Sequence, residues 1–214
     1  TNEEMWNLVR LGYMPIQLVL GVSVYALGVV GGVSAFLKSF ARGEVTTLST
    51  LIYEARANAL LQVKQSTTVP ICSGENLYTL RDYRPFFERQ AMDIAMVDVP
   101  WNGLAQSKKI ADAAETYELN VAPHNYYSHL ATLISAHFCA VVPNLRILEV
   151  DVDDVPWKDE IVTTPPEIRD GHLVLPSAPG WGADLNEDVI RAHPWPAVRK
   201  TGAPAPSARA PASV

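Results

Sequence analysis

The chain has 214 residues, of which 48% are hydrophobic and 19% are charged, as is typical of a folded protein with one or two domains. Its formal net charge is −6 and its pI is about 5.3. An acidic chain lacks the clustered Lys and Arg surface that nucleic-acid binding requires, so we expect no nucleic-acid partner.

The cysteines and the first residues predict the compartment. Cys72 and Cys139 both lie in apolar segments, which favours buried thiols in a reducing compartment over a disulfide framework. The chain begins Thr-Asn-Glu-Glu, without the basic start and cleavage site of a signal peptide. We therefore expect a cytoplasmic protein.

The first apolar segment, Leu11–Leu37, allows two interpretations. It carries no charged residue and contains Gly28 and Gly32 at the spacing found in membrane helix pairs. Its β-branched residues also alternate along residues 19–26, and its glycines interrupt a continuous span. We favour a strand followed by a buried helix, with a membrane helix as the alternative.

A helical pattern follows from Glu44 to Gln62, where apolar residues recur every three or four positions. Together with the glycine-rich segment before it, this helix completes a small α/β module. We place the boundary of this module at residue 62.

From residue 60 to about residue 190, short apolar runs alternate with segments of helical periodicity. The predicted helices lie between the apolar runs and span Leu80–Gln90, Ala105–Tyr117 and Ser128–Val142. Strands and helices in this regular order predict parallel strands joined by crossover helices. The sequence therefore predicts an α/β domain over residues 63–193.

Each apolar run is followed by a polar residue. These residues are Glu75, Asp98, His124 and Glu149, at intervals of 23, 26 and 25 residues. One strand and helix unit of a (βα)8 barrel takes roughly 30 residues, and active sites lie at the carboxyl ends of its strands. The spacing therefore predicts a partial (βα)8 TIM barrel of four βα units, with four polar residues at one end.

Turn-forming residues dominate the rest of the chain. The segment 151–188 contains Thr163–Pro166 and Pro179–Gly182, and we expect it to form loops that wrap over other elements. Residues 194–214 consist largely of Pro, Ala, Arg and Ser without periodicity, which predicts a disordered tail.

Four segments of the predicted barrel are similar to one known family. They are Pro70–Asn76, Ala91–Val99, Val121–Asn125 and Pro165–Gly171. They resemble the C-terminal part of the mandelate racemase and muconate lactonizing group of the enolase superfamily, in particular its sugar-acid dehydratases of the galactonate type. The resemblance covers roughly residues 60–196 and makes the four units equivalent to strands five to eight of that family's barrel.

The resemblance implies a reaction in which Mg²⁺ assists removal of a proton next to a carboxylate. By it, Glu75 is one of three carboxylate ligands of Mg²⁺, a hard cation that prefers oxygen donors. Asp98 and His124 form a base dyad, in which the aspartate fixes the imidazole tautomer and supports its cation. Glu149, when protonated, hydrogen-bonds the enolate oxygen. The implied substrate is an acid-sugar carboxylate, and the implied enzyme is a dehydratase (a carbon-oxygen lyase) or a racemase.

The same residues also have ordinary structural interpretations. An aspartate after a strand often caps a helix, and a glutamate at a strand end is often solvated. Trp101 and Asn102, which follow Asp98, either line the pocket or pack within the loop. His129, His137 and His172 have no matching role in the family pattern.

The chain before residue 60 departs from the family pattern. The resemblance does not extend to a capping domain, four further strands, a lysine pair or two further metal carboxylates. One carboxylate would leave most of the Mg²⁺ coordination sphere to water. We therefore expect weak Mg²⁺ binding and little or no activity from the chain alone.

Residues 8–62 instead resemble the first part of the YbjQ-like family, for which heavy-metal binding has been suggested. The similar segments are Leu18–Tyr25, Gly31–Gly32 and Leu51–Arg56. Residues 1–62 contain no Cys or His, so soft-metal ligands are missing there. We predict a chimeric or truncated chain: a partial YbjQ-like module (1–62), a half-barrel with its closing loop (63–193) and a tail (194–214).

Two functions are compatible with this organisation. The first is a fragment or fusion of a Mg²⁺-dependent sugar-acid dehydratase whose activity needs the missing half of the site. The alternative is a non-catalytic oligomerisation or binding module with relic site residues. Half a barrel exposes a sheet edge and part of its core, so we expect a homo-oligomer in which two chains complete a barrel.

Overall fold

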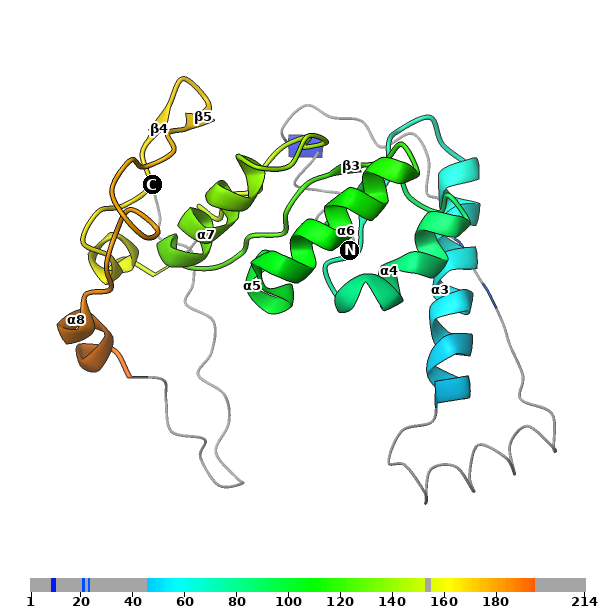
Figure 1. The fold of residues 1–214 in the computed structure, drawn as a ribbon, viewed down its shortest axis with the longest axis horizontal. Coiled ribbons are helices and arrows are strands. Elements are labelled where there is room, and N and C mark those ends of the chain that lie inside the picture. The colour runs from blue at the N-terminus through cyan, green and yellow to red at the C-terminus, as the bar shows by residue number, and fades with distance from the viewer. Residues whose placement is uncertain (1–8, 11–20, 22, 24–45, 153–154, 195–214) are drawn as a thin grey trace, which may run out of the picture.

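Helices and short strands alternate along the part of the chain that the computed structural model describes, which comprises residues 9–10, 21, 23, 46–152 and 155–194. From residue 46 on, the elements in chain order are α3 (Thr46–Gln65), β1 (Cys72–Ser73), α4 (Thr79–Glu88), β2 (Ile94–Ala95), α5 (Val99–Asn102), α6 (Leu104–Thr116), β3 (Asn120–Val121) and α7 (His129–Cys139). The 3₁₀ helix η1 (Lys158–Ile161), β4 (Ile168–Arg169), β5 (His172–Leu173) and α8 (Glu187–Ala192) follow. Figure 1 shows α3 at one end of the described structure and α8 at the other.

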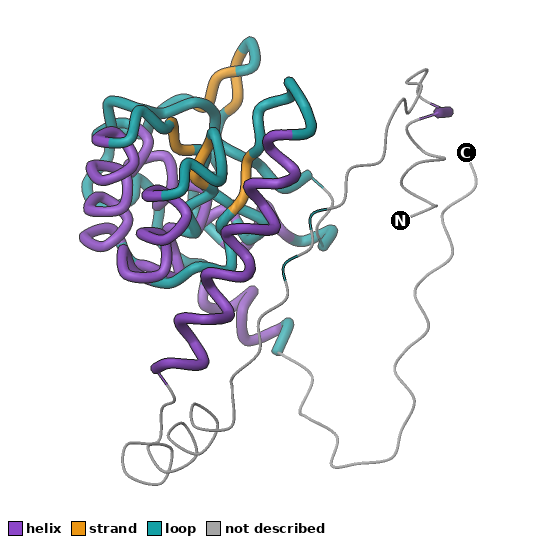
Figure 2. Tube along the Cα trace, turned by 90° about the vertical axis from the view of Figure 1, so that its right-hand side faces the viewer, coloured by secondary structure: helices purple, strands orange, loops and turns teal. Residues whose placement is uncertain are grey.

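The first three strands form one parallel sheet in the order β1-β2-β3. One row of paired residues is Ser73, Ala95 and Val121, and the other row is Cys72, Ile94 and Asn120. The first row is the more buried, and the second is exposed or half-buried. Figure 2 shows most of the helices on one side of these strands. Parallel sheets are normally covered on both faces. Here the helices cover one face, and the described residues leave the other face, which is the inner face in a barrel, open.

The apolar faces of the helices fill the space against the outer face of the sheet. In α6 the buried residues recur at helical spacing and are Ser107, Ile110, Ala111 and Ala114. In α4 they are Asp82, Tyr83, Phe86 and Phe87. The core also takes in α3 through Ala57, which is fully buried. The three predicted crossover helices are therefore present and pack as crossover helices do.

The fourth predicted strand, before Glu149, is reduced to a single parallel bridge between Val121 and Leu145. Two backbone hydrogen bonds hold it, from Val121 N–H to the Asn144 carbonyl (2.9 Å) and from Arg146 N–H to the Val121 carbonyl (2.8 Å). Among the described residues the segment pairs on one side only, and 66% of the Ile147 surface is exposed. The segment lies where a fourth strand would, but the part of the chain that the structure describes places no strand on its outer side, and only one bridge forms.

Cys72 is exposed, which corrects the prediction of a buried thiol. It belongs to the uncovered row of β1, at the edge of the sheet, and an apolar run buries its residues only when both faces of the strand are covered. Cys139 in α7 is half-buried, and burial raises the pKa of its thiol to about 12. Both cysteines are free thiols.

Helix α3 joins the N-terminal region to the barrel segment. The Tyr53 hydroxyl donates to the buried carboxylate of Asp82 at the start of α4 (2.9 Å). Near the end of α3, the Lys64 ammonium lies 3.0 Å from Asp93, and the Asp93 carboxylate accepts the Ile71 N–H (2.8 Å). The predicted domain boundary at residue 62 thus falls inside a continuous helix, and it stays a prediction.

The closing segment is more regular than the loops predicted for residues 151–188. Strands β4 and β5 form an antiparallel hairpin, with Ile168 opposite Leu173. Its turn residues Asp170 and Gly171 both have positive φ angles, 50° and 75°. An Asp-Gly pair is a strong hairpin signal because both positions tolerate this conformation. The signal was present in the sequence, and the loop prediction was wrong at this point.

Several predictions lie outside the described residues. The apolar segment Leu11–Leu37 is described only at Gly21 and Ser23, and the tail only at Pro194. Most of the YbjQ-like region falls in the same gap. Within the described ranges, no helix combines the length and apolar character needed to cross a membrane.

Candidate active site

The four predicted site residues all follow the carboxyl end of a strand or of the bridge that replaces one. Glu75 follows β1, Asp98 follows β2 and His124 follows β3. Glu149 follows the segment bridged at Leu145. Asp98 and His124 themselves form a parallel bridge. The parallel order of the strands therefore brings these side chains to one end of the sheet, as the spacing predicted.

Asp98 and His124 form a hydrogen-bonded pair. His124 Nδ1 lies 2.9 Å from Asp98 Oδ2, and because a carboxylate can only accept, Nδ1 carries the hydrogen. Asp98 is 1% exposed, whereas the His124 side chain is 22% exposed. The second nitrogen, Nε2, lies 3.9 Å from Glu149 Oε2. The pair thus has an oriented imidazole whose outer nitrogen faces a second carboxylate.

Asp98 has a structural role as well. Its Oδ1 accepts the backbone N–H of Trp101 at 2.9 Å and so caps α5, a four-residue helix that the sequence did not predict. Its Oδ2 remains for His124. Asp98 therefore caps α5 and also hydrogen-bonds His124, since each contact uses a different oxygen.

Glu149 is held in place by a residue that the sequence did not single out. Asn125, which is completely buried, donates its backbone N–H to Glu149 Oε2 at 2.8 Å. Its side-chain amide donates to the Glu149 carbonyl (3.0 Å) and to the Thr132 hydroxyl (2.9 Å). Asn125 therefore ties the end of β3 to the segment that carries Glu149 and to helix α7.

Tyr127 is a second contact that the sequence did not reveal. Its hydroxyl donates to Asp98 Oδ2 at 2.6 Å, and its ring meets the His124 ring edge-on with centroids 5.6 Å apart. Burial, and then the hydrogen bond and the charge of Asp98, raise the pKa of the Tyr127 hydroxyl well above its ordinary value. The hydroxyl is therefore a hydrogen-bond donor at neutral pH.

Gly74 and Tyr83 shape the strand end that carries Glu75. The buried Tyr83 hydroxyl donates to the carbonyls of Gly74 (2.8 Å) and Met96 (3.0 Å), which links the ends of β1 and β2. Gly74 has a φ of 124°, and a Cβ there would lie 2.9 Å from a ring carbon of Tyr83. Only glycine fits this turn.

Glu75 is the predicted metal ligand. Its Oε1 accepts the Asn76 amide at 2.9 Å, and its Oε2 accepts the Gly74 N–H at 3.3 Å. Partial burial raises the pKa of the Cys72 thiol, and the charges of Glu75 and Glu149 raise it further, so both carboxylates lie within electrostatic range of Cys72. The described residues contain no cluster of three His, Cys, Asp or Glu side chains that could hold a metal ion. Glu75 fits Mg²⁺ as a single oxygen ligand and does not make a site alone.

The loop residues Trp101 and Asn102 belong mainly to packing. Trp101 stacks on Tyr78 with ring centroids 5.4 Å apart. The Asn102 side chain accepts the Thr79 N–H at 2.8 Å and donates to the Asp98 carbonyl at 3.0 Å. These contacts hold the loops after β1 and β2 together at the mouth of the site.

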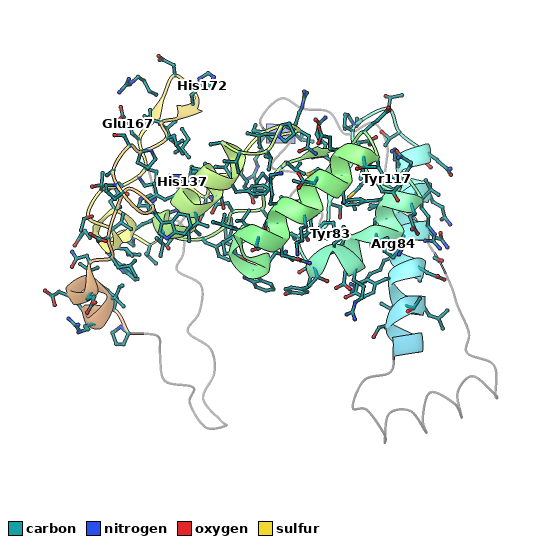
Figure 3. All side chains as sticks on the ribbon, viewed as in Figure 1. Tyr83, Arg84, Tyr117, His137, Glu167 and His172 are labelled. Carbon is teal, nitrogen blue, oxygen red and sulfur yellow. The ribbon has the colours of Figure 1, made fainter. Side chains whose placement is uncertain are left out.

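Three further histidines, His129, His137 and His172, contact groups other than the dyad. His129 Nε2 is 2.6 Å from Asp159 in η1, and the His137 ring packs near Trp181. Figure 3 shows His172 on the β4–β5 hairpin, where its Nδ1 contacts the Asp170 carbonyl. These contacts give the three histidines structural partners in the closing segment.

Comparison with known proteins identifies the fold around this site. A family described as "Enolase C-terminal domain-like" matches residues 51–189, so the match begins within α3. The chain is 39% identical over 132 residues to a D-xylonate dehydratase from Haloferax volcanii, covering 61% of this chain and 32% of that protein. The chain spans about a third of the length of the curated relatives it matches.

Solved structures support the same assignment. A proposed L-alanine-DL-glutamate epimerase from Burkholderia xenovorans, bound to magnesium and fumarate, is 48% identical with a TM-score of 0.63, over 64% of this chain and 34% of that one. A mandelate racemase/muconate lactonizing enzyme-like protein from Rubrobacter xylanophilus is 41% identical with a TM-score of 0.59, over 64% and 35%. The chain therefore belongs to the enolase C-terminal domain-like family and corresponds to the C-terminal part of the mandelate racemase and muconate lactonizing group.

Proposed function

We propose that this chain carries the base half of a Mg²⁺-dependent sugar-acid dehydratase, which removes the proton next to a carboxylate and then eliminates water. The geometry of His124 carries the proposal. One ring nitrogen is bound to a buried carboxylate, and the other is oriented toward the open end of the sheet, 3.9 Å from Glu149. This is the arrangement that a histidine base needs near neutral pH.

The proposed reaction uses His124 for both proton movements. Nε2 takes the proton from the carbon next to the carboxylate, and the C–H electron pair passes into an enolate. Asp98 stabilises the resulting imidazolium through Nδ1. The enolate electrons then form a C=C bond as the neighbouring C–O bond breaks, and the imidazolium proton joins the departing hydroxide as water. The enol product becomes a 2-keto-3-deoxy acid in solution.

Glu149 lies on the other side of the base and is proposed to hydrogen-bond the enolate oxygen. Its Oε2 is fixed by the Asn125 backbone N–H, and its side chain is 37% exposed. A donor held in place before the reaction stabilises developing negative charge without reorganisation. This role requires Glu149 to be protonated when the enolate forms.

The proposed Mg²⁺ would bind Glu75 and ligands supplied from outside the described residues. When bound, such an ion stabilises negative charge on a carboxylate and on the enolate derived from it. Glu75 presents hard oxygens at the end of β1, and a Burkholderia xenovorans neighbour was solved with magnesium bound. We expect weak Mg²⁺ binding and low activity from this chain alone.

An epimerase is the second candidate, because the 48% identical Burkholderia xenovorans protein is described as a proposed L-alanine-DL-glutamate epimerase. Epimerisation begins with the same proton removal but returns a proton to the opposite face of the carbon. The relatives named as dehydratases of xylonate, arabinonate and gluconate support the elimination of water instead. The two reactions differ in their second step.

Proton NMR in D₂O distinguishes these reactions. The chain is incubated with Mg²⁺ and a panel of aldonates, together with L-Ala-D-Glu and L-Ala-L-Glu. We expect slow loss of the α-proton signal of at least one aldonate, followed by signals of a 3-deoxy-2-keto acid. Exchange confined to the dipeptides, without elimination, would support the epimerase.

Two matched variants identify the base. His124→Asn removes the proposed base and should abolish exchange. His172→Asn makes the same change on the outer hairpin and should leave exchange at the wild-type rate. Exchange that survives in His124→Asn would contradict the role of His124, and no exchange in the wild-type chain would favour the non-catalytic alternative.

An assembly role is the competing class of function. The open face of the sheet and the exposed Val141, Leu145 and Ile147 favour association with a second copy of the chain. Sedimentation velocity over a range of concentrations tests this interpretation. A strictly monomeric species throughout would rule out the paired barrel.

A further inference from the structure

The Asp98 carboxylate accepts hydrogen bonds from three directions. Oδ1 takes the Trp101 N–H, and Oδ2 is shared between His124 Nδ1 at 2.9 Å and the Tyr127 hydroxyl at 2.6 Å. An aspartate that serves only to orient a histidine needs no second donor on the same oxygen. The hydroxyl of Tyr127 therefore competes directly with the imidazole for the charge on Oδ2.

The strength of this contact follows from its chemistry. A hydroxyl donating to a carboxylate at 2.5–2.7 Å is a charge-assisted hydrogen bond, roughly twice as strong as a neutral one. It draws electron density away from Oδ2, so less of the negative charge remains to stabilise an imidazolium at His124. Partial burial and the nearby Asp98 raise the pKa of the Tyr127 hydroxyl, which keeps it a donor over the working pH range.

We infer that Tyr127 is a positioning residue that sets the basicity of His124 through the shared oxygen of Asp98. The inference rests on the proposed function, in which His124 is the base. An imidazole paired with a bare buried aspartate is stabilised as its cation, which makes it slow to release a proton. The tyrosine hydroxyl lowers that stabilisation, so that His124 can accept the substrate proton and return it to the leaving hydroxide.

Other titratable groups surround the dyad. Glu149 faces Nε2 at 3.9 Å; its ionised form favours the imidazolium, and its protonated form, which the proposed reaction uses, adds no such charge. Burial, and then the charge of Asp98, raise the pKa of the Tyr83 hydroxyl, but this hydroxyl donates to two backbone carbonyls and not to Asp98. The more distant groups, coupled to members of the site but not bonded to Asp98, are Tyr78, Cys72 and Glu75. Tyr127 is the tyrosine that bonds the oxygen shared with His124.

The experiment measures the pKa of His124 itself, independently of activity. The full chain is prepared with ¹³C-labelled histidine, His124→Asn assigns the resonance, and the signal is followed from pH 5 to pH 9. Tyr127→Phe removes the hydroxyl and keeps the ring against His124. We expect the pKa of His124 to rise by about one unit, a tenfold change in its proton affinity.

The control is Tyr126→Phe, which makes the same change at the neighbouring tyrosine, a residue that is 57% exposed. It should leave the pKa of His124 unchanged. A pKa of His124 that is unchanged or lower in a folded Tyr127→Phe would overturn the inference. This result is separable from the deuterium-exchange test, since the pKa of His124 can change in Tyr127→Phe even when the chain does not turn over substrate.

A second variant covers the case in which Tyr127→Phe does not fold. Site-specific 3-fluorotyrosine at position 127 keeps the size of the ring and makes the hydroxyl a stronger donor. The inference then requires the pKa of His124 to fall, measured below the pH at which the fluorinated hydroxyl ionises. A rise or no change would count against it.

Discussion

Replacing Asn125 by alanine removes the amide that joins three parts of the site. The side-chain nitrogen donates to the Glu149 carbonyl at 3.0 Å and to the Thr132 hydroxyl at 2.9 Å, and the residue is completely buried. The backbone N–H that binds the Glu149 carboxylate is retained in Asn125→Ala. The substitution therefore tests the side-chain contacts alone.

The expected loss of stability can be worked out from these contacts. Each hydrogen bond contributes about 1 kcal/mol net, and the small cavity left by the amide costs about 1 kcal/mol more. The sum is about 3 kcal/mol of unfolding free energy. For a protein of this size, that lowers the Tm by about 6–12 °C.

Urea unfolding followed by circular dichroism measures this loss through the shift of the midpoint. The control is Asn76→Ala, which removes an exposed amide bonded to the Glu75 carboxylate. We expect that control to change stability by less than about 0.5 kcal/mol. If Asn125→Ala lowers the free energy of unfolding by less than about 1 kcal/mol, the side-chain amide does not hold the strand ends together.

Three further predictions concern the surroundings of the site. Gly74→Ala should destabilise the protein by about 2–4 kcal/mol in urea, because its φ of 124° is strained for alanine and the new Cβ would lie 2.9 Å from Tyr83; a neutral effect would show that the tyrosine moves freely. Lys158→Met should cost about 3–5 kcal/mol in the same assay, because it leaves the buried Asp151 carboxylate without this cation at 3.5 Å; a loss below about 1 kcal/mol would contradict this. Partial burial raises the pKa of the Asp93 carboxyl, but the hydrogen bond from the Ile71 N–H and the charge of Lys64 outweigh it, so the pKa is lowered overall. The Asp93 carboxylate therefore contributes fully to the free energy of unfolding above its unfolded-state pKa of about 3.9, and this contribution is lost as the pH falls through the lower folded-state pKa. The difference in unfolding free energy between wild type and Asp93→Asn should be large at pH 6 and shrink below pH 4.

The positions of the site residues could be predicted because they depend on chain order alone. Parallel strands end at the same edge, so a polar residue after each apolar run must lie near its counterparts. The spacing therefore located Asp98 and His124 correctly, and helical periodicity located the crossover helices to within a few residues, as with Leu80–Gln90 against the observed Thr79–Glu88.

The contacts around these residues could not be predicted in the same way. Asn125 and Tyr127 lie one and three positions after His124, but their bonds depend on side-chain directions in a loop, for which the sequence has no periodic signal. The exposure of Cys72 and the weak fourth strand depend on what covers the other side of the sheet. The Asp170-Gly171 turn, by contrast, has a local signal in the sequence.

The order β1-β2-β3 has a consequence for how pieces of this fold can be exchanged between proteins. Each strand pairs with its sequence neighbour, and α6 packs between α4 and α7, so the main contacts run from one unit to the next as in a repeat protein. In an arrangement of this kind, a break between two units disturbs one interface and leaves the others intact. The pair formed by Asp98 and His124 lies wholly within adjacent units. Recombination at a unit boundary can therefore move this dyad, with its geometry preserved, into a new protein.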